Sequence, residues 1–201
     1  MSETAIQKAE PRKMAGANAI SPVLEFDTTT HAYRLNGGRI PGVTEILKSA
    51  GLVDTSFFTE ASAWRGTALH LACQLDDEGD LDPATVDDSL TGKLEAWRRF
   101  KLEMAFVPLA IERMRVTEKN GMKFAGTPDR EGMLGAWKAV LDLKSGAIRP
   151  ETALQLAGYS MLCDVQHRIA IRLHDSGRYE LKVFLIRGLR QDCNQFLAAL
   201  S

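Results

Sequence analysis

The sequence has few cysteines and no long apolar run, and each scarcity argues against a class of protein. Cys73, Cys163 and Cys193 are the three cysteines among 201 residues; they lie far apart and form no CxxC pair. An odd, scattered set of this kind does not suggest a disulfide framework. No stretch approaches the roughly 18 apolar residues of a transmembrane helix, and the N-terminus lacks the apolar core of a secretory signal. We therefore expect a protein of the reducing cytoplasm with no membrane segment.

The charge balance is also uninformative about partners, because the formal net charge is -1. If the chain binds a polyanion, its basic residues must gather on one face. No GxxxxGK[ST] loop occurs, so the sequence contains no helicase P-loop. A length of 201 residues, 45% of them hydrophobic, fits one domain of ordinary size. We expect a flexible tail at residues 1–21 and a single domain at 22–201.

The first half of that domain is predicted to carry a small β-meander and several helices. Alternating residues 23–27 and 31–35 flank a Thr-rich turn, and Asn36-Gly37-Gly38 supplies the next turn. A short helix is expected to begin near Val43. Residues 59–76 have helical character with Thr59 as N-cap, and the acidic run that follows is expected to form a solvated loop. From 88 to 106 the apolar residues recur at helical spacing.

The second half alternates strands with helices. Residues 112–118, 124–133 and 137–144 are predicted strands, and a helix is expected from Pro150 to about Cys163. Strands at 168–174 and 179–186 and a short helix at 191–200 complete the pattern. The fold class is therefore α/β, with a central mixed β-sheet flanked by helices. We divide the domain into an N-terminal elaboration (22–109), a core (110–190) and a closing helix (191–201).

The segment Val140-Leu-Asp-Leu-Lys-Ser-Gly146 carries the strongest chemical signal. Alternate residues of a strand share a face, so Asp142 and Lys144 point one way while Leu141 and Leu143 point the other. A carboxylate and an ammonium so placed on an otherwise apolar strand indicate a polar pocket. An ordinary ion pair at a sheet edge would give the same pattern.

A second carboxylate lies upstream in Gly126-Thr-Pro-Asp-Arg130. Pro128 donates no ladder hydrogen bond and suits a bend, which would turn Asp129 toward the strand of Asp142. Two converging carboxylates form an oxygen site of the type that Mg²⁺ or Mn²⁺ prefers. Lys144 would then orient or deprotonate a water, or stabilise developing charge.

These residues resemble the PD-(D/E)XK nuclease superfamily, whose signature is matched by Pro128-Asp129 followed by Asp142-Leu143-Lys144. Gln155-Leu-Ala-Gly-Tyr159 is similar to the QxxxY motif of its RecB-like branch, and Arg65-Gly-Thr-Ala-Leu-His70 to the GxxxH helix motif. The segment from His31 to Leu47 resembles the opening of small phage-borne exonucleases of this type. The resemblance spans roughly residues 26 to 187 and implies a restriction-endonuclease-like core.

The resemblance also implies roles for individual residues. Asp129, Asp142, the Leu143 carbonyl and His70 would hold the metal, and Lys144 would be the catalytic lysine. Glu112 would reach the metal or its water, although a solvated glutamate is the plain alternative. A structural role is the alternative for His70. Gln155 and Tyr159, together with Arg65 and Arg149, would contact DNA or support the site; an ordinary amphipathic helix is the alternative for the first two.

The activity implied by the resemblance is hydrolysis of DNA phosphodiester bonds with Mg²⁺ or Mn²⁺, by an exonuclease or end-processing nuclease of phage or bacterial recombination and repair. A sequence-tolerant endonuclease and a catalytically silent module that binds nucleic acid or protein are the alternatives. Three scattered cysteines exclude the four-cysteine iron–sulfur cluster of some relatives. Expected partners are DNA, as duplex ends or single strands, and a single-strand annealing protein; an oligomer is left open. Phosphate contacts are predicted from the basic residues Arg98, Arg99, Lys101, Arg113, Arg115, Lys119, Lys123, Arg130 and Arg149.

Overall fold

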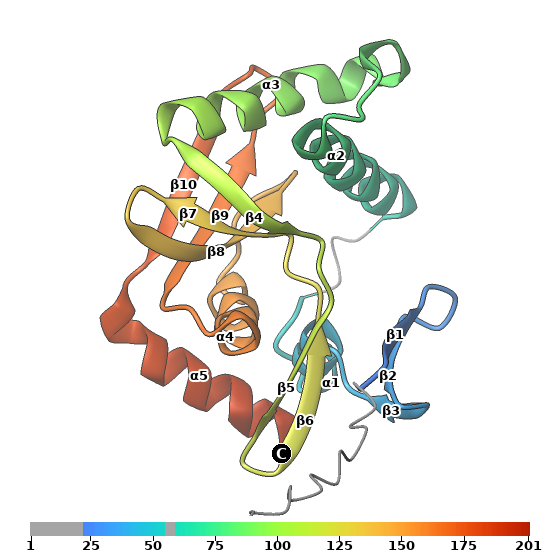
Figure 1. Cartoon of the computed structure of the whole chain (residues 1–201), viewed down its shortest axis with the longest axis vertical. Helices are drawn as coiled ribbons and strands as arrows, with labels where there is room; N and C mark the ends of the chain where they lie inside the picture. The colour runs from blue at the N-terminus through green and yellow to red at the C-terminus, as the bar shows by residue number, and fades with distance from the viewer. Residues whose placement is uncertain (1–21, 55–58) are drawn as a thin grey trace, which may run out of the picture.

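A five-stranded sheet in the order β10-β9-β8-β7-β4 forms the centre of the computed structural model (Figure 1). The structure describes residues 22–54 and 59–201, and the tail predicted for residues 1–21 lies outside them. The strands are β4 (Phe106–Ile111), β7 (Arg130–Leu134), β8 (Trp137–Lys144), β9 (His167–Leu173) and β10 (Tyr179–Phe184). β8 and β9 pair in parallel, and the other neighbours in this sheet are antiparallel. The mixed α/β fold predicted from the sequence is confirmed.

Helices cover both faces of this sheet. α2 (Glu60–Glu78) and α3 (Asp88–Glu103), joined through the short 3₁₀ turn Pro83–Thr85, pack on one face, where Trp97 and Phe100 meet Leu141. α1 (Val43–Ser49), α4 (Thr152–Cys163) and α5 (Ile186–Leu200) pack on the other, where Phe196 and Val140 share a core. Among the described helices, none has a stretch of sufficient length and apolarity to cross a membrane.

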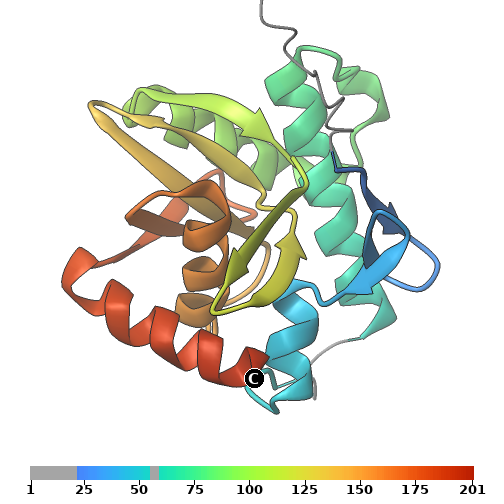
Figure 2. The same cartoon turned by 60° about the horizontal axis from the view of Figure 1, so that its bottom comes forward.

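Two smaller β units lie beside the core. The predicted meander is confirmed as the antiparallel strands β1 (Leu24–Asp27), β2 (Ala32–Leu35) and β3 (Gly38–Ile40). The hairpin of β5 (Arg115–Lys119) and β6 (Met122–Gly126) turns at Asn120-Gly121. A bridge between Gly42 and Ala125 ties the segment after the meander to this hairpin. Figure 2 shows the meander, in blue, on the same side of the molecule as α1 and the hairpin.

Several predicted boundaries were wrong for identifiable reasons. The strand predicted at 124–133 is two strands, β6 and β7, because the chain leaves the ladder around Pro128. The strand predicted at 112–118 corresponds to β5, which begins at Arg115. The sequence prediction missed β4, an edge strand with Pro108 at a register shift. α5 begins at Ile186 rather than 191, so β10 ends at Phe184, earlier than predicted.

The acidic end of α2 is not the solvated loop that the sequence predicted. Asp76 and Asp77 lie inside the last helical turns, and the Asp77 side chain is fully buried. Lys101 Nζ lies 2.5 Å from Asp77 Oδ1, and Trp97 Nε1 donates to the same oxygen at 2.9 Å. Arg98 pairs with Asp76 at 2.6 Å. Because these cations from α3 neutralise the carboxylates, the acidic run packs against the second helix instead of ending in water.

Candidate metal centre and active site

β8 delivers Asp142 and Lys144 to one face of the sheet, as the alternation predicted. Leu141 and Leu143 belong to the core under α2 and α3, whereas Val140 belongs to the core under α4 and α5. Asp142 therefore lies on the α4 side, where it is only 2% exposed. Its Oδ2 lies 2.8 Å from Lys144 Nζ, yet this oxygen accepts no hydrogen bond of good geometry among the described residues. A buried carboxylate oxygen left in this state favours a further cationic partner.

Asp129 reaches the same place from the bend between β6 and β7. The bend follows Gly126 and contains Pro128, so the chain leaves one hairpin and enters the central sheet within three residues. Asp129 Oδ2 accepts a hydrogen bond of 2.6 Å from the Leu143 N–H, which fixes the carboxylate against β8. The sequence-based expectation that Asp129 turns toward the strand of Asp142 is met.

His70 and Glu112 complete the group from two other elements. His70, on α2, places Nε2 3.1 Å from the Leu143 carbonyl oxygen. Glu112 follows β4 with a left-handed backbone (φ 44°), and its N–H donates to the Asp129 carbonyl at 3.1 Å. A non-glycine residue in that region costs roughly 1–3 kcal/mol and persists where the surroundings impose it. The Glu112 carboxylate lies toward the site, with Oε1 3.6 Å from His70 Nδ1.

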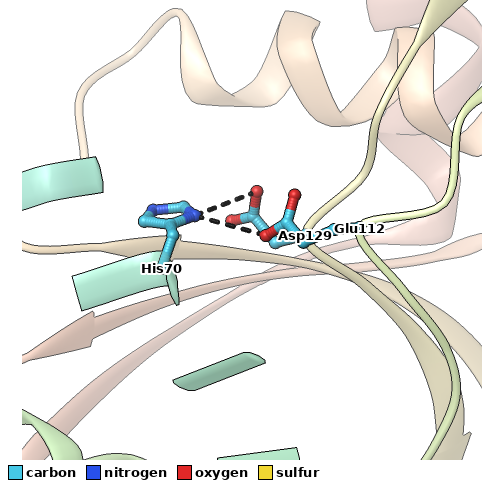
Figure 3. A group of neighbouring side chains, drawn as sticks. All are labelled: His70, Glu112 and Asp129. Carbon is cyan, nitrogen blue, oxygen red and sulfur yellow. Dashed lines mark ion pairs between the residues drawn. The ribbon is translucent and has the colours of Figure 1, made fainter. Parts of the chain in front are cut away.

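Three of these side chains converge on one point (Figure 3). His70 Nδ1 lies 3.4 Å from Asp129 Oδ1 and 3.6 Å from Glu112 Oε1, and the ligand atoms of the three residues all lie within 4.8 Å of one another. With Nε2 directed at a carbonyl, neutral His70 would present its Nδ1 lone pair to two carboxylates. That arrangement requires positive charge between them, supplied by a proton or by a cation.

The pKa directions reflect this crowding of acids. The Asp129 charge is the main cause that raises the pKa of His70 well above 6.5. Burial is the largest influence on Asp129 and would raise its pKa, but the charge and hydrogen bond of His70, the Lys144 charge and the Leu143 N–H together outweigh burial, and the pKa is lowered. Burial raises the pKa of Glu112 and raises that of Asp142 to about 6, against the opposing effect of Lys144 on the latter. Acids held in this way are receptive to a cation.

Lys144 is held by the predicted QxxxY pair. Its ammonium donates to Gln155 Oε1 at 3.0 Å, and Gln155 Nε2 donates to the Tyr159 hydroxyl at 3.3 Å. Burial would lower the pKa of Lys144, but the charge and hydrogen bond of Asp142, with the charges of Asp129 and Glu151, together outweigh burial, and the pKa is raised. Burial also raises the pKa of Tyr159 well above its usual 10. The structure therefore brings Gln155 and Tyr159 onto Lys144, which stays an ammonium.

Arg130 is a supporting residue that the sequence misassigned to the phosphate-facing set. It is fully buried, and its Nε lies 2.6 Å from Asp77 Oδ2. Its Nη1 donates to the Asp129 carbonyl at 2.5 Å and lies 3.4 Å from Glu112 Oε1. The guanidinium thus holds two of the acidic residues from behind. The position of Arg130 directly after Asp129 is a local hint of this role. The buried partner that establishes it, Asp77, lies 53 residues away in the sequence.

The remaining predicted residues lie around the site rather than in it. Arg65 is exposed on α2 and lines a cleft of about 500 Å³ with Lys93 and Ser145, the residue after Lys144. Arg149 is half-buried before α4. Other cations of the predicted set are occupied, since ion pairs join Arg98 and Lys101 to the acidic end of α2, Arg99 to Glu103 and Arg115 to Glu131.

The comparisons with known proteins give a distant structural likeness. No protein-family model matches the chain, and no curated protein matches it. Among solved structures, the alkaline exonuclease LHK-Exo from Laribacter hongkongensis is similar at 17% identity and TM-score 0.39, over 80% of this chain and 87% of that one. LHK-Exo in complex with dAMP matches at 17% identity over the same shares with TM-score 0.40. SSO0001 matches at 15% identity over 78% and 73%, with TM-score 0.42. All three likenesses are distant, and they carry no residue roles to this chain.

Proposed function

We propose that this chain is a metal-dependent nuclease that hydrolyses phosphodiester bonds in DNA. The observation that carries the proposal is the convergence of His70, Glu112 and Asp129 beside the buried pair of Asp142 and Lys144. Carboxylates from three separate segments repel one another, so their assembly opposes folding unless it serves binding. A lysine held as an ammonium next to a cation site suits a substrate whose charge grows during reaction, as a phosphodiester's does.

The donor set fits a divalent cation. Carboxylate and carbonyl oxygens suit Mg²⁺ and Mn²⁺, and an imidazole ligand adds a preference for Mn²⁺. His70, Glu112 and Asp129 would hold the ion, and Asp142 and the Leu143 carbonyl are the neighbouring oxygen donors. The ion would supply Lewis-acid polarisation of the phosphoryl group and would lower the pKa of a bound water.

Each protein group then has a defined task. Lys144 holds its proton, because its pKa is raised, and its ammonium would stabilise charge on the phosphoryl oxygens rather than remove a proton. Gln155 positions the Lys144 amine, and Tyr159 in turn anchors Gln155. Arg130 holds the Asp129 backbone and the Glu112 carboxylate in place from the buried side.

We propose DNA as the substrate, with an exonuclease or end-processing activity in phage or bacterial recombination and repair. Arg65 and Arg149 would contact phosphates from the two sides of the β8 end. A sequence-tolerant endonuclease would use the same residues. A silent module is disfavoured, since Asp129, Asp142 and Lys144 are all present, Asp142 and Lys144 form an ion pair on β8, and Asp129 accepts a hydrogen bond from Leu143 between them.

Cleavage of end-labelled linear DNA and of covalently closed circles, in Mg²⁺, Mn²⁺ or EDTA, tests the proposal. Loss of linear DNA alone identifies an exonuclease, and nicking of circles identifies an endonuclease. Asp129→Asn should abolish cleavage, whereas Asp164→Asn, at an exposed left-handed helix cap (φ 52°) that tolerates asparagine, should leave it unchanged. If wild type binds DNA but cuts neither form in any metal, the nuclease proposal is wrong and the silent module replaces it.

A further inference from the structure

A second cavity, of about 410 Å³, opens beside the candidate active site and is lined by the β-meander. Phe26, His31 and Tyr33 contribute aromatic rings to its wall, and Arg39 and Lys48 contribute cations. Tyr159 and Gly126 form the side nearest the catalytic residues. We call this cavity the aromatic pocket. None of the roles assigned above uses the meander side chains that form it.

The aromatic rings form a platform whose geometry is fixed by local structure. Phe26 and Tyr33 are cross-strand partners with ring centroids 4.7 Å apart, and His31 meets Phe26 edge-on at 6.0 Å. His31 has a left-handed backbone (φ 51°) at the end of a turn. Asp27 holds this turn, because its carboxylate accepts hydrogen bonds from the Thr29 and Thr30 N–H groups at 2.9 and 3.2 Å. Phe26 nevertheless remains 37% exposed, so an aromatic face is left for a ligand.

Hydrogen bonds link the pocket to both halves of the candidate active site. The Tyr33 hydroxyl lies 2.8 Å from Thr127 Oγ1, two residues before Asp129. Tyr159 lines the pocket and accepts a hydrogen bond from Gln155, which holds Lys144. A ligand that contacts Tyr159 would therefore be linked to Lys144 through Gln155, and one that contacts Tyr33 would be linked through Thr127 to the segment that carries Asp129.

The charges favour an anionic ligand with a flat ring. Arg39 pairs with Glu45 at 2.6 Å, whereas Lys48 is exposed and makes no ion pair among the described residues. The lining thus has two cations and one carboxylate beside exposed aromatic rings. Aromatic faces interleaved with basic side chains bind unpaired nucleotides, because every base has a face that stacks and every nucleotide carries a phosphate.

We propose that the aromatic pocket binds one unpaired base of the DNA strand next to the phosphodiester to be cut. This inference rests on the proposed nuclease function and adds to it a site that requires the strand to be single-stranded at that nucleotide. A base stacked on Phe26 would fix the register of the backbone relative to Asp129 and Lys144. A fully paired end would have to open before cleavage.

The test combines protein substitutions with abasic positions in the DNA. Affinity is measured by fluorescence anisotropy in Mn²⁺, with a single-stranded oligonucleotide whose phosphorothioate linkages slow cleavage. An abasic nucleotide is moved along the strand one position at a time. Wild type should lose roughly 5- to 100-fold in affinity at one abasic position, the loss expected for one base–aromatic stack. Phe26→Leu, which keeps apolar bulk without a ring, should bind intact DNA as weakly as wild type binds the abasic DNA. Its affinity should not fall further when the base at that position is removed.

Further variants separate stacking from folding. Phe26→Trp should restore binding, and His31→Asn, which tolerates the left-handed backbone, should weaken it without disturbing the meander. Trp137→Leu is the matched control, since Trp137 is 60% exposed at the opposite end of β8 from Lys144. Phe26→Leu and the abasic position should each cause the same loss of affinity, and together no more than either alone. If their separate losses of affinity multiply when they are combined, the two act at different places and the pocket proposal is overturned.

Two outcomes distinguish this inference from the proposed function. An enzyme that cleaves DNA normally, and whose Phe26→Leu variant has wild-type affinities throughout the scan, refutes the pocket and leaves the nuclease proposal standing. A wild type that cleaves nothing but shows the Phe26-dependent abasic penalty supports the pocket and refutes the nuclease proposal.

Discussion

Replacing Asp142 by asparagine should make the metal-free protein more stable while it removes activity. Asp142 is 2% exposed, and burial raises its pKa from 3.8 to about 6 even with Lys144 beside it. At about 1.4 kcal/mol for each pKa unit, the ionised carboxylate disfavours the folded state by up to about 3 kcal/mol. Asparagine keeps the shape and removes the charge. At pH 8 without metal, Asp142→Asn should therefore be more stable than wild type, by at most that amount.

The sign of the pH dependence follows from the direction of this pKa change. Between pH 3.8 and about 6 the folded state holds a proton that the unfolded state has lost, so the contribution of Asp142 to stability falls as the pH rises. Asparagine does not titrate. The stability advantage of Asp142→Asn should thus be present above pH 6 and shrink toward pH 4.

Metal should reverse the ranking of the two proteins. At a Mn²⁺ concentration 100 times the Kd, wild type gains about 2.7 kcal/mol. For a chain of this size that corresponds to a rise in Tm of roughly 5–10 °C. Asp142→Asn should show a much smaller rise, and the exposed Asp164→Asn control should respond like wild type. The assay is urea unfolding at pH 4, 6 and 8 with EDTA, followed by thermal unfolding in Mn²⁺. Equal destabilisation of Asp142→Asn at all three pH values, with a wild-type response to Mn²⁺, would refute the reasoning.

Three further outcomes test the positioning residues and the packing. Gln155→Leu removes a hydrogen bond to the Lys144 ammonium, so kcat should fall roughly 10- to 100-fold with little change in KM, as measured by steady-state cleavage. Gly92→Ala should destabilise the protein in urea unfolding, because a Cβ there would lie 1.8 Å from a backbone carbonyl of the β9–β10 turn. Gly188→Ala on α5, where a Cβ would meet only the Asp192 side chain at 4.0 Å, should instead stabilise it by up to about 1 kcal/mol. Asp76→Asn should destabilise the protein at pH 7. Burial raises the pKa of Asp76, but hydrogen bonds from its two cations outweigh burial and the net pKa is lowered. The stabilising contribution of the Asp76 carboxylate is therefore present above pH 3.8. The difference from wild type should close as the pH falls below 3.8 in unfolding titrations.

The parts of the site that local pattern determines were predictable from sequence. A strand has a period of two residues, so the pairing of Asp142 with Lys144 on one face required only that 137–144 be a strand. The helical spacing of Gln155 and Tyr159 likewise placed both on one side of α4. The meander followed from its turn residues. In each case the decisive interactions join residues close together in the chain.

The parts that tertiary contacts determine were not predictable. β4 follows α3 after a reversal at Ala105 (φ 46°), and its Pro108 disguises an edge strand. Arg130 lies on β7, and its buried guanidinium pairs with Asp77, which belongs to α2. A basic residue beside a candidate catalytic carboxylate could contact the substrate or support the site, and only the packing decides between these roles.

The balance of charge around the site explains why the fold tolerates so many acids. Arg130 and Asp77 neutralise each other in the interior, and Lys144 offsets Asp142, which leaves the two carboxylates that converge with His70, Glu112 and Asp129. Two negative charges then remain while His70 is neutral, and one remains while it is protonated. Protonated His70 therefore holds the metal-free site together only in part, which agrees with the raised pKa of His70. A divalent cation would neutralise the site and release the proton from His70, so metal binding should strengthen as the pH rises.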